Sequence, residues 1–282
     1  MFESSVFAVI VVALSIPASA GSLLTTPTPS LMIGRFTAEP ESFASVSLPL
    51  TLTSDTAWEI FVSRVPSANP NAHPSGEKLF VHDAQGDWSE VRETAPTLIA
   101  AGLPTDPSGA TLIVELRATA TLDSSVGERG GTVEFRTAGA PPLDVDYRYE
   151  VLPTLSVTET SEEQLAGLVP TKAGTYPFVS KTYLVKANVP WVLEIALRRP
   201  LMTKGGVNSI GGEKIVVLSS DHLPAVPLKL DRPVRIAHGN ATGEAGVIVP
   251  VRLALANTTL EPAGTYSGEI DAVVRQNGDP RP

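Results

Sequence analysis

The chain has 282 residues, a formal net charge of −9 at neutral pH and no cysteine. The negative charge is spread along the chain, which argues against nucleic acid and anionic membrane surfaces as partners. With 25 prolines, 22 glycines and short alternating apolar runs, the composition indicates an all-β protein long enough for two domains. Because disulfides are excluded, its stability must come from hydrophobic cores.

Residues 1–20 have the pattern of a secretory signal peptide. An apolar run, VFAVIVVAL, is followed by the small residues ASA at the positions that signal peptidase reads. The run is too short to span a membrane, which takes about 20 apolar residues. The first residues carry Glu3 and no lysine or arginine, so a retained N-terminal anchor stays open as the alternative. We expect a mature chain that begins at Gly21, has no transmembrane segment, and is secreted, periplasmic or at the cell surface.

Residues 21–30 (GSLLTTPTPS) are expected to form a Thr/Pro-rich leader that is extended and mobile. A first β-sandwich is expected from residue 31 to residue 150. Its pattern begins clearly at Leu48, where LPLTLT alternates apolar and polar residues, and a second alternating run starts at Trp58 after a turn. A tryptophan at a strand start favours a core position, and an aromatic platform for a sugar is the alternative.

Among the local stretches of the sequence, residues 82–90 (HDAQGDWSE) most resemble a ligand-binding site. Asp83, Asp87 and Glu90 could offer oxygens to Ca²⁺, and Trp88 could stack on a ligand such as a glycan. The spacing does not match the EF-hand loop. An Asx-type hairpin turn accounts for the same residues without a ligand. The three carboxylates are therefore weak metal candidates, and we expect no cofactor.

A second β-sandwich is expected from residue 151 to residue 282, directly after the first, with no flexible linker. Trp191 starts the alternating run WVLEIAL, and Tyr266 lies in LEPAGTY at the start of the last strand. This spacing resembles the tyrosine corner of immunoglobulin-type Greek keys, in which the tyrosine hydrogen-bonds back across the corner. We expect Trp58, Trp191 and Tyr266 to be structural core residues.

The two halves of the chain share one register, 137 residues apart. LIVELRATA from Leu112 aligns with VPVRLALAN from Val249, and PTLIAAGLPT from Pro96 aligns with PVRIAHGNAT from Pro233. The match runs without a gap and brings glycines onto glycines, which predicts a tandem duplication. Chance matching in a composition rich in Ala, Gly and Val is the alternative.

No catalytic constellation is visible in the sequence. The four histidines are scattered without metal-binding spacing, and no serine lies in a G-x-S-x-G motif. Each candidate catalytic group lacks its partner, so we expect that the protein is not an enzyme.

The segments SDTAWEIFV and ANVPWVLEI, together with the late PAGTYSGEIDAVV, are similar to bacterial exported immunoglobulin-like modules. They look most like fimbrial and spore-coat-protein-U-type surface subunits, which end in a Gly-Thr-Tyr-x-Gly strand. The resemblance implies two tandem immunoglobulin-like antiparallel β-sandwich domains after a signal peptide. It also implies assembly through extended strands, with residues 23–36 as the candidate donor strand. A loose tether, or the first strand of its own domain, is the alternative for this N-terminal segment. Coat-U-type subunits often carry cysteines, which are missing here.

Two classes of function follow. The first is a non-catalytic exported structural or adhesive protein, such as a fimbria- or coat-like subunit, that contacts other proteins or copies of itself at the cell surface. The second is a carbohydrate- or calcium-binding surface module in which Trp88 and its acidic neighbours form the site. An exposed Trp88 beside converging carboxylates would favour the second class.

Overall fold

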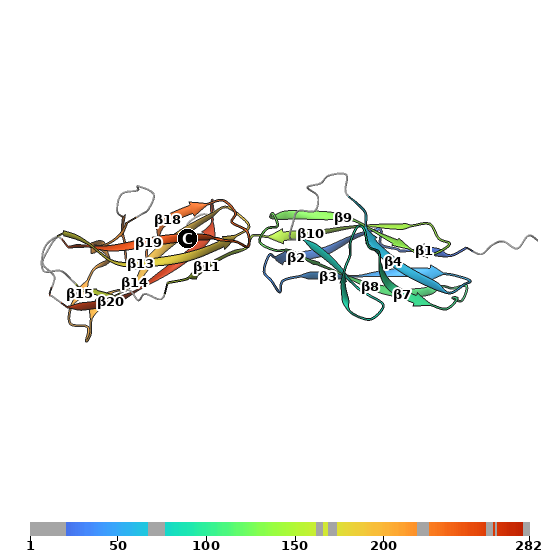
Figure 1. The fold of residues 1–282 in the computed structure, drawn as a ribbon, viewed down its shortest axis with the longest axis horizontal. Helices are drawn as coiled ribbons and strands as arrows, with labels where there is room; N and C mark the ends of the chain where they lie inside the picture. The colour runs from blue at the N-terminus through green and yellow to red at the C-terminus, as the bar shows by residue number, and fades with distance from the viewer. Residues whose placement is uncertain are drawn as a thin grey trace, which may run out of the picture.

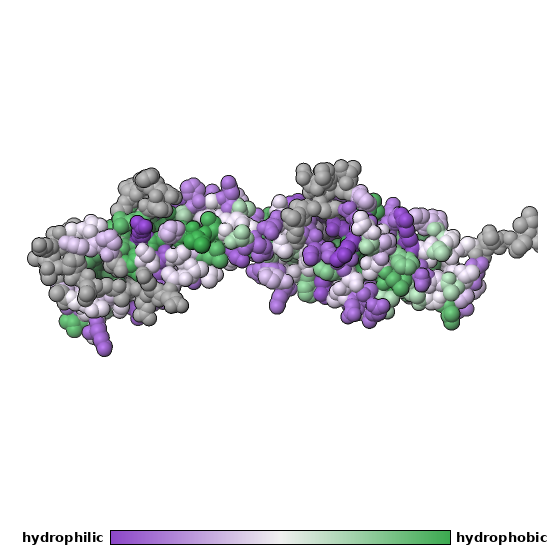
Figure 2. Space-filling model, viewed as in Figure 1, coloured by the Kyte–Doolittle hydropathy of each residue, from purple (hydrophilic) through white to green (hydrophobic). Residues whose placement is uncertain are grey.

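The computed structural model describes residues 21–66, 77–161, 166–168, 174–218, 226–257, 262 and 264–278. In these residues the chain is all-β, with twenty strands in four five-stranded sheets, consistent with two β-sandwiches. Figure 1 shows two halves lying end to end, and Figure 2 shows polar side chains over much of the surface in that view. Within the described ranges, no helix is long and apolar enough to cross a membrane. The predicted signal peptide, residues 1–20, lies outside these ranges.

The first sandwich packs the sheet β1-β3-β8-β5-β6 against the sheet β2-β10-β9-β4-β7. The pairs are antiparallel except β2 with β10, which run parallel. The strands are β1 Leu23–Thr25, β2 Ser30–Thr37, β3 Ala44–Thr53, β4 Trp58–Arg64, β5 Lys78–His82, β6 Trp88–Glu90, β7 Thr97–Gly102, β8 Ala110–Thr119, β9 Gly127–Arg136 and β10 Leu143–Leu152.

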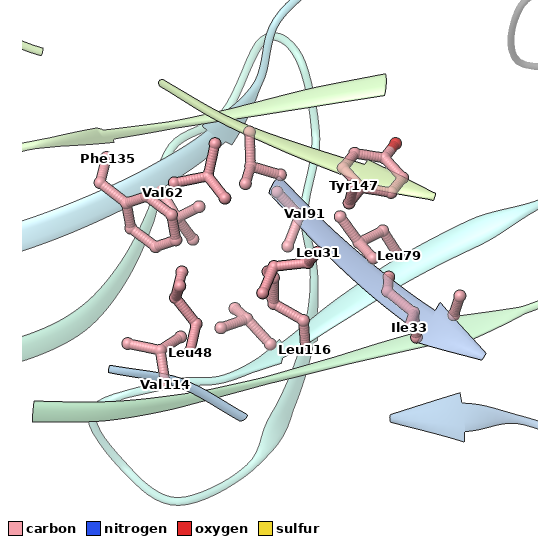
Figure 3. Close-up of a cluster of buried hydrophobic side chains, with 14 of the residues drawn as sticks. Leu31, Ile33, Leu48, Val62, Leu79, Val91, Val114, Leu116, Phe135 and Tyr147 are labelled. Atoms are coloured by element: carbon pink, nitrogen blue, oxygen red, sulfur yellow. The ribbon is translucent and has the colours of Figure 1, made fainter. Parts of the chain in front are cut away.

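A hydrophobic core fills the space between these two sheets. Inward and outward side chains alternate along each strand, as in β3, where Leu48 and Leu52 are fully buried. Figure 3 shows side chains from both sheets meeting in this core, including Phe135 of β9. The strand β10 adds four buried side chains: Val145, Tyr147, Tyr149 and Val151.

Residues 21–30, expected to be a mobile leader, are instead part of the first sandwich. The strand β1 pairs with β3, and Leu24 is buried. Pro27 and Pro29 lie in the short connection where the chain leaves one sheet and enters the other as β2, so they interrupt the strand without removing ladder hydrogen bonds. The donor-strand hypothesis for residues 23–36 is wrong for the same reason, because β1 and β2 are already paired within their own sandwich.

The second sandwich packs the sheet β11-β13-β19-β16-β17 against a sheet in which β14 pairs with β20, β15 and β18. A short 3₁₀ turn, Gly212–Lys214, precedes β16. The strands are β11 Leu155–Glu159, β12 Ala166–Leu168, β13 Gly174–Ala187, β14 Trp191–Thr203, β15 Ser209–Ile210, β16 Ile215–Leu218, β17 Val226–Pro227, β18 Val234–Gly239, β19 Val247–Asn257 and β20 Thr265–Gln276.

Each sandwich buries a tryptophan against a glycine of the neighbouring strand. Trp58 pairs with Gly102, and Trp191 pairs with Gly239. A Cβ atom built on Gly102 would lie 2.5 Å from Cζ2 of Trp58, and one on Gly239 would lie 2.8 Å from Cζ2 of Trp191. Glycine is therefore required at both places by the flat contact with the indole ring. Neither indole N–H has an acceptor in the described structure.

The two sandwiches are joined through a two-residue connection between β10 and β11. Asn188 accepts the backbone N–H of Thr154 at 2.8 Å and donates its amide to the Leu152 carbonyl at 3.2 Å. On another side of the junction, a Glu244 carboxylate oxygen accepts the Leu122 N–H at 3.0 Å. These bonds fix the backbone on both sides of the connection, so the junction is held by more than the covalent chain.

Candidate functional site

The carboxylate of Asp83 is used by a hairpin turn within residues 82–90. Asp83 Oδ1 accepts the N–H groups of Gln85 at 2.9 Å and Asp87 at 3.0 Å, and its other oxygen accepts the Ser89 hydroxyl at 2.6 Å. The hydrogen bond from Ser89, followed by that from Asp87, lowers the pKa of Asp83. Gly86 completes the turn with a φ of 86°, a conformation that glycine adopts without strain.

The structure does not bring the three candidate metal ligands together. Glu90 lies 3.6 Å from Arg92 in an ion pair, while Asp83 serves the turn. Within the described ranges, no group of three or more His, Asp or Glu side chains could hold a metal ion. The Asx-type alternative therefore accounts for the Asp83 carboxylate, and Asp87 takes part in the same turn through its backbone N–H and C=O.

Trp88 lies in an aromatic cluster on the outer face of the first sandwich. Its ring centroid is 4.2 Å from that of His82. On the same face, Cζ of Arg117 lies 3.8 Å from the Trp88 ring centroid and 4.0 Å from that of Phe43. The sequence analysis identified Trp88 but missed Arg117 and Phe43, because only the pairing of β3, β8 and β5 brings these distant residues together.

Tyr266 is buried and donates its hydroxyl to the Pro262 carbonyl, four residues upstream, at 2.9 Å. In the aligned register, the first sandwich has Arg129 at this place. Arg129 lies 3.2 Å from a carboxylate oxygen of the buried Glu77, which also accepts the hydroxyl of Tyr149. Burial raises the pKa of Glu77, and the hydrogen bond from Tyr149 and the Arg129 charge offset part of that rise.

The two sandwiches differ at one sheet edge. In the first, β9 lies between β4 and β10, and β10 in turn pairs with β2. In the second, β20 pairs with β14 on one side, but on its other side only residues 265–267 have a partner, the three-residue strand β12. Along residues 268–276 no strand in the described part of the chain pairs with that side. We name residues 268–276 the open edge.

The open edge contains an incompletely covered apolar row. Ile270, Ala272 and Val274 pack against the core of the second sandwich but are only partly buried. At the corresponding places in β9, Val133 and Phe135 are 0% exposed. The difference arises because β10 lies beside β9, whereas β20 has no such neighbour in the described chain.

The strand β11, at the border of the opposite sheet, lies near β20 without pairing with it. Its inward residues Leu155 and Val157 are also only partly buried. Close to both strands, the buried hydroxyl of Tyr183 has no hydrogen-bond acceptor in the described structure. Burial, and then the carboxylates of Glu159 and Asp271, raise the pKa of Tyr183, so this hydroxyl is a hydrogen-bond donor at neutral pH.

A separate groove of about 330 Å³ lies between β18 and β19. Its lining includes Ile236, Val249 and the exposed Ile248, and Figure 2 shows apolar side chains gathered over these strands. No Asp, Glu, Lys or Arg is among the described residues that line it. The groove can take apolar groups but offers no charged side chain to orient a ligand.

No family model and no curated protein matches the sequence. Three similar solved structures come from pili. The CsuC–CsuE chaperone–tip adhesion subunit complex of archaic chaperone-usher Csu pili of Acinetobacter baumannii matches with 9% identity and a TM-score of 0.45, over 89% of this chain and 99% of that chain. The CupB6 tip adhesin of Pseudomonas aeruginosa matches with 12% identity and a TM-score of 0.32, over 85% of this chain and 87% of that chain. A chaperone–tip adhesin complex of CFA/I fimbriae matches with 12% identity and a TM-score of 0.31, over 89% of this chain and 97% of that chain.

These proteins are of the fimbrial surface-subunit type that the sequence resembles. Each of the three contains a tip adhesin or a tip adhesion subunit. At these identities and TM-scores the likeness transfers no residue role to this chain.

Proposed function

We propose that this protein is a non-catalytic adhesive subunit of a fimbria-like assembly, and that it joins a neighbouring subunit by accepting an extended strand at the open edge. The observation that carries the proposal is the side of β20 along residues 268–276 with which no strand of the described ranges pairs. Unpaired backbone N–H and C=O groups beside an apolar row are the features that strand addition uses.

The chemistry of the open edge defines the strand that fits it. Backbone groups on β20 supply the ladder, and the partly buried Ile270, Ala272 and Val274 favour apolar side chains at every second position of the incoming strand. A hydrogen-bond acceptor near Tyr183 would satisfy the buried hydroxyl. The incoming strand would also have to move β11, which lies near β20.

The remaining parts of the proposal concern architecture and compartment. The parallel pairing of β2 with β10, and the presence of two opposed sheets in each half, support tandem immunoglobulin-like domains. The first domain then includes β1 and extends to the end of β10 at Leu152, two residues beyond the expected boundary, and the second begins with β11 at Leu155. Residues 1–20 would direct export, with periplasmic assembly and display at the cell surface.

A peptide that copies β10, LDVDYRYEVL, provides the direct test. In the first sandwich this strand lies beside β9, at the place where no described strand pairs with residues 268–276 of β20. Added to residues 21–282, the peptide should raise the melting temperature and slow hydrogen exchange of backbone amides within residues 268–276. A control peptide with serine at its four inward positions should do neither.

Two variants of the chain locate the binding. Ile270→Ser removes an inward apolar side chain from the open edge and should weaken peptide binding by about tenfold. Val273→Ser changes an exposed side chain of the same strand and should leave binding unchanged. Equal binding of both peptides, or no added protection within residues 268–276 at saturating peptide, would overturn the proposal.

A further inference from the structure

A second candidate site lies on the first sandwich, on the outer face of the sheet that contains β3, β8, β5 and β6. We name it the Arg117 patch and define it as Arg117, Phe43, Phe80, His82 and Trp88. Because side chains alternate along a strand, Arg117 of β8 points outward between the buried Leu116 and Ala118. Strand pairing then places Phe80 opposite Arg117 and His82 opposite Trp88.

The guanidinium of Arg117 lies between two aromatic rings and has no anionic partner among the described residues. Its Cζ is 3.8 Å from the Trp88 centroid and 4.0 Å from the Phe43 centroid. No ion pair or hydrogen bond joins it to the described residues, and its buried Nε has no acceptor. By contrast, Arg129 and Arg275 are each held by a buried glutamate. Cation–π contact fixes the orientation of Arg117 but satisfies none of its N–H donors.

The patch borders a shallow groove of about 320 Å³. Aromatic side chains supply one wall, with Phe43 48% exposed, and Ser42 and Thr119 add hydroxyl groups. The volume lies at the lower end of the usual range for small-ligand sites. A single sugar unit therefore fits the space better than a large folded partner.

We propose that the Arg117 patch binds a saccharide that carries a carboxylate. The planar guanidinium presents paired N–H donors in the geometry that a carboxylate accepts, and the cation is not already neutralised. The exposed ring surface beside it suits the apolar C–H face of a sugar ring. The two contacts together select an acidic sugar over a neutral one.

Two observations further restrict the class of ligand that fits the patch. The strands β8 and β5, which carry Arg117, Phe80 and His82, are paired on both sides, so the backbone beside the guanidinium offers no free edge to an extended peptide. Only the three-residue border strand β6, which carries Trp88, is paired on one side alone among the described strands. Glu41 lines the groove, and Glu115 lies on the same face, 4.0 Å from His82. These carboxylates oppose a densely charged polyanion, so the patch fits an isolated carboxylate. The inference does not depend on the strand-addition proposal, because the two sites lie on different sandwiches.

The test uses residues 21–282 with glucuronic acid, N-acetylneuraminic acid and an oligouronate as probes, and glucose as the neutral comparison. At least one acidic probe should bind in calorimetry at concentrations up to about 10 mM and change tryptophan fluorescence. Trp88 should report this change, because Trp58 and Trp191 are buried. Trp88→Phe should remove the optical signal while keeping an aromatic ring and measurable heat of binding.

Variants separate the role of the charge from that of the fold. Arg117→Gln should weaken binding of the acidic probe by about tenfold or more. Arg117→Lys should weaken it by less, since lysine keeps the positive charge but lacks the paired N–H donors of the guanidinium. Arg148→Gln, at an exposed arginine on the opposite sheet, is the matched control and should change nothing. Phe43→Ala gives a second test through the stacking surface if Arg117→Gln fails to fold. Equal binding of glucose, unchanged affinity in a folded Arg117→Gln, or no binding of any acidic probe would overturn the proposal.

Discussion

The first and second sandwiches share a framework but differ in how completely each covers its own core. In the first, β10 lies between β9 and β2 and contributes Tyr147 and its neighbours to the core. In the second, β20 holds the place of β9, and the strand beside it is missing along residues 268–276 of the described chain. In the described residues, one strand is the difference between a domain with a covered core and a domain whose apolar row is only partly buried.

The same comparison explains a difference at one aligned position. Tyr266 closes the second sandwich with a hydrogen bond to the carbonyl of Pro262, whereas Arg129 in the first reaches the buried Glu77. Glu77 also accepts the hydroxyl of Tyr149 from β10. The first sandwich can hold an ion pair at this place because β10 supplies a further donor to the buried carboxylate.

The largest effect should come from the feature that the two sandwiches have in common. Trp58→Ala and Trp191→Ala each remove a buried indole and should cost about 3–5 kcal/mol of the free energy of unfolding. Calorimetry should show that each substitution lowers the temperature of the unfolding transition of the sandwich that carries it. Unchanged melting in both variants, with lost binding of a glycan, would instead support the aromatic-platform alternative.

Two substitutions at aligned positions should show that the two sandwiches differ in how much unfolding free energy a buried apolar side chain contributes. Val133→Ala, in the fully covered β9, should cost about 2 kcal/mol. Ile270→Ala removes a larger group but should cost only about 1 kcal/mol, because Ile270 is already partly exposed at the open edge. Denaturant unfolding measures both values. A greater loss for Ile270→Ala would show that the open edge is already covered in solution.

The smallest effect concerns pH and the buried Glu77. Burial raises its pKa, so the folded chain holds this proton more tightly than the unfolded chain does. The resulting stabilisation is fully present below the ordinary glutamate pKa of 4.5 and is lost as the pH rises through the higher folded value. Urea unfolding from about pH 4 to pH 8 should show this loss, and Glu77→Gln should remove it. The same pH slope in both proteins would contradict the assignment.

Local patterns in the sequence predicted much of the strand content. Alternation placed Leu48, Leu50 and Leu52 on one face, and all three are buried. The aligned register also pointed to Gly102 and Gly239, whose role is clear only once the indole contacts are seen. The predicted duplication stays a prediction, supported by these matching tryptophan–glycine pairs.

Non-local features escaped sequence reasoning. Proline at positions 27 and 29 predicted a loose leader, but the pairing of β1 and β2 depends on strands far along the chain. The alternation in β20 is the same whether or not a strand lies beside it, so the open edge has no local signature. Arg117 likewise carries no hint in its own neighbourhood that Trp88 and Phe43 lie against it.

The short connection at the junction has a mechanical consequence. Tension applied through the second sandwich would enter the first at Leu152 and run along the axis of β10. In β10, nine residues pair with β9 and seven pair with β2. A force along the strand axis would therefore act as shear on the hydrogen bonds of both pairings at the same time. Peeling would break such bonds one at a time, whereas shear requires many to fail together. A ligand bound to the first sandwich would therefore be held by a domain whose loaded strand is paired on both sides.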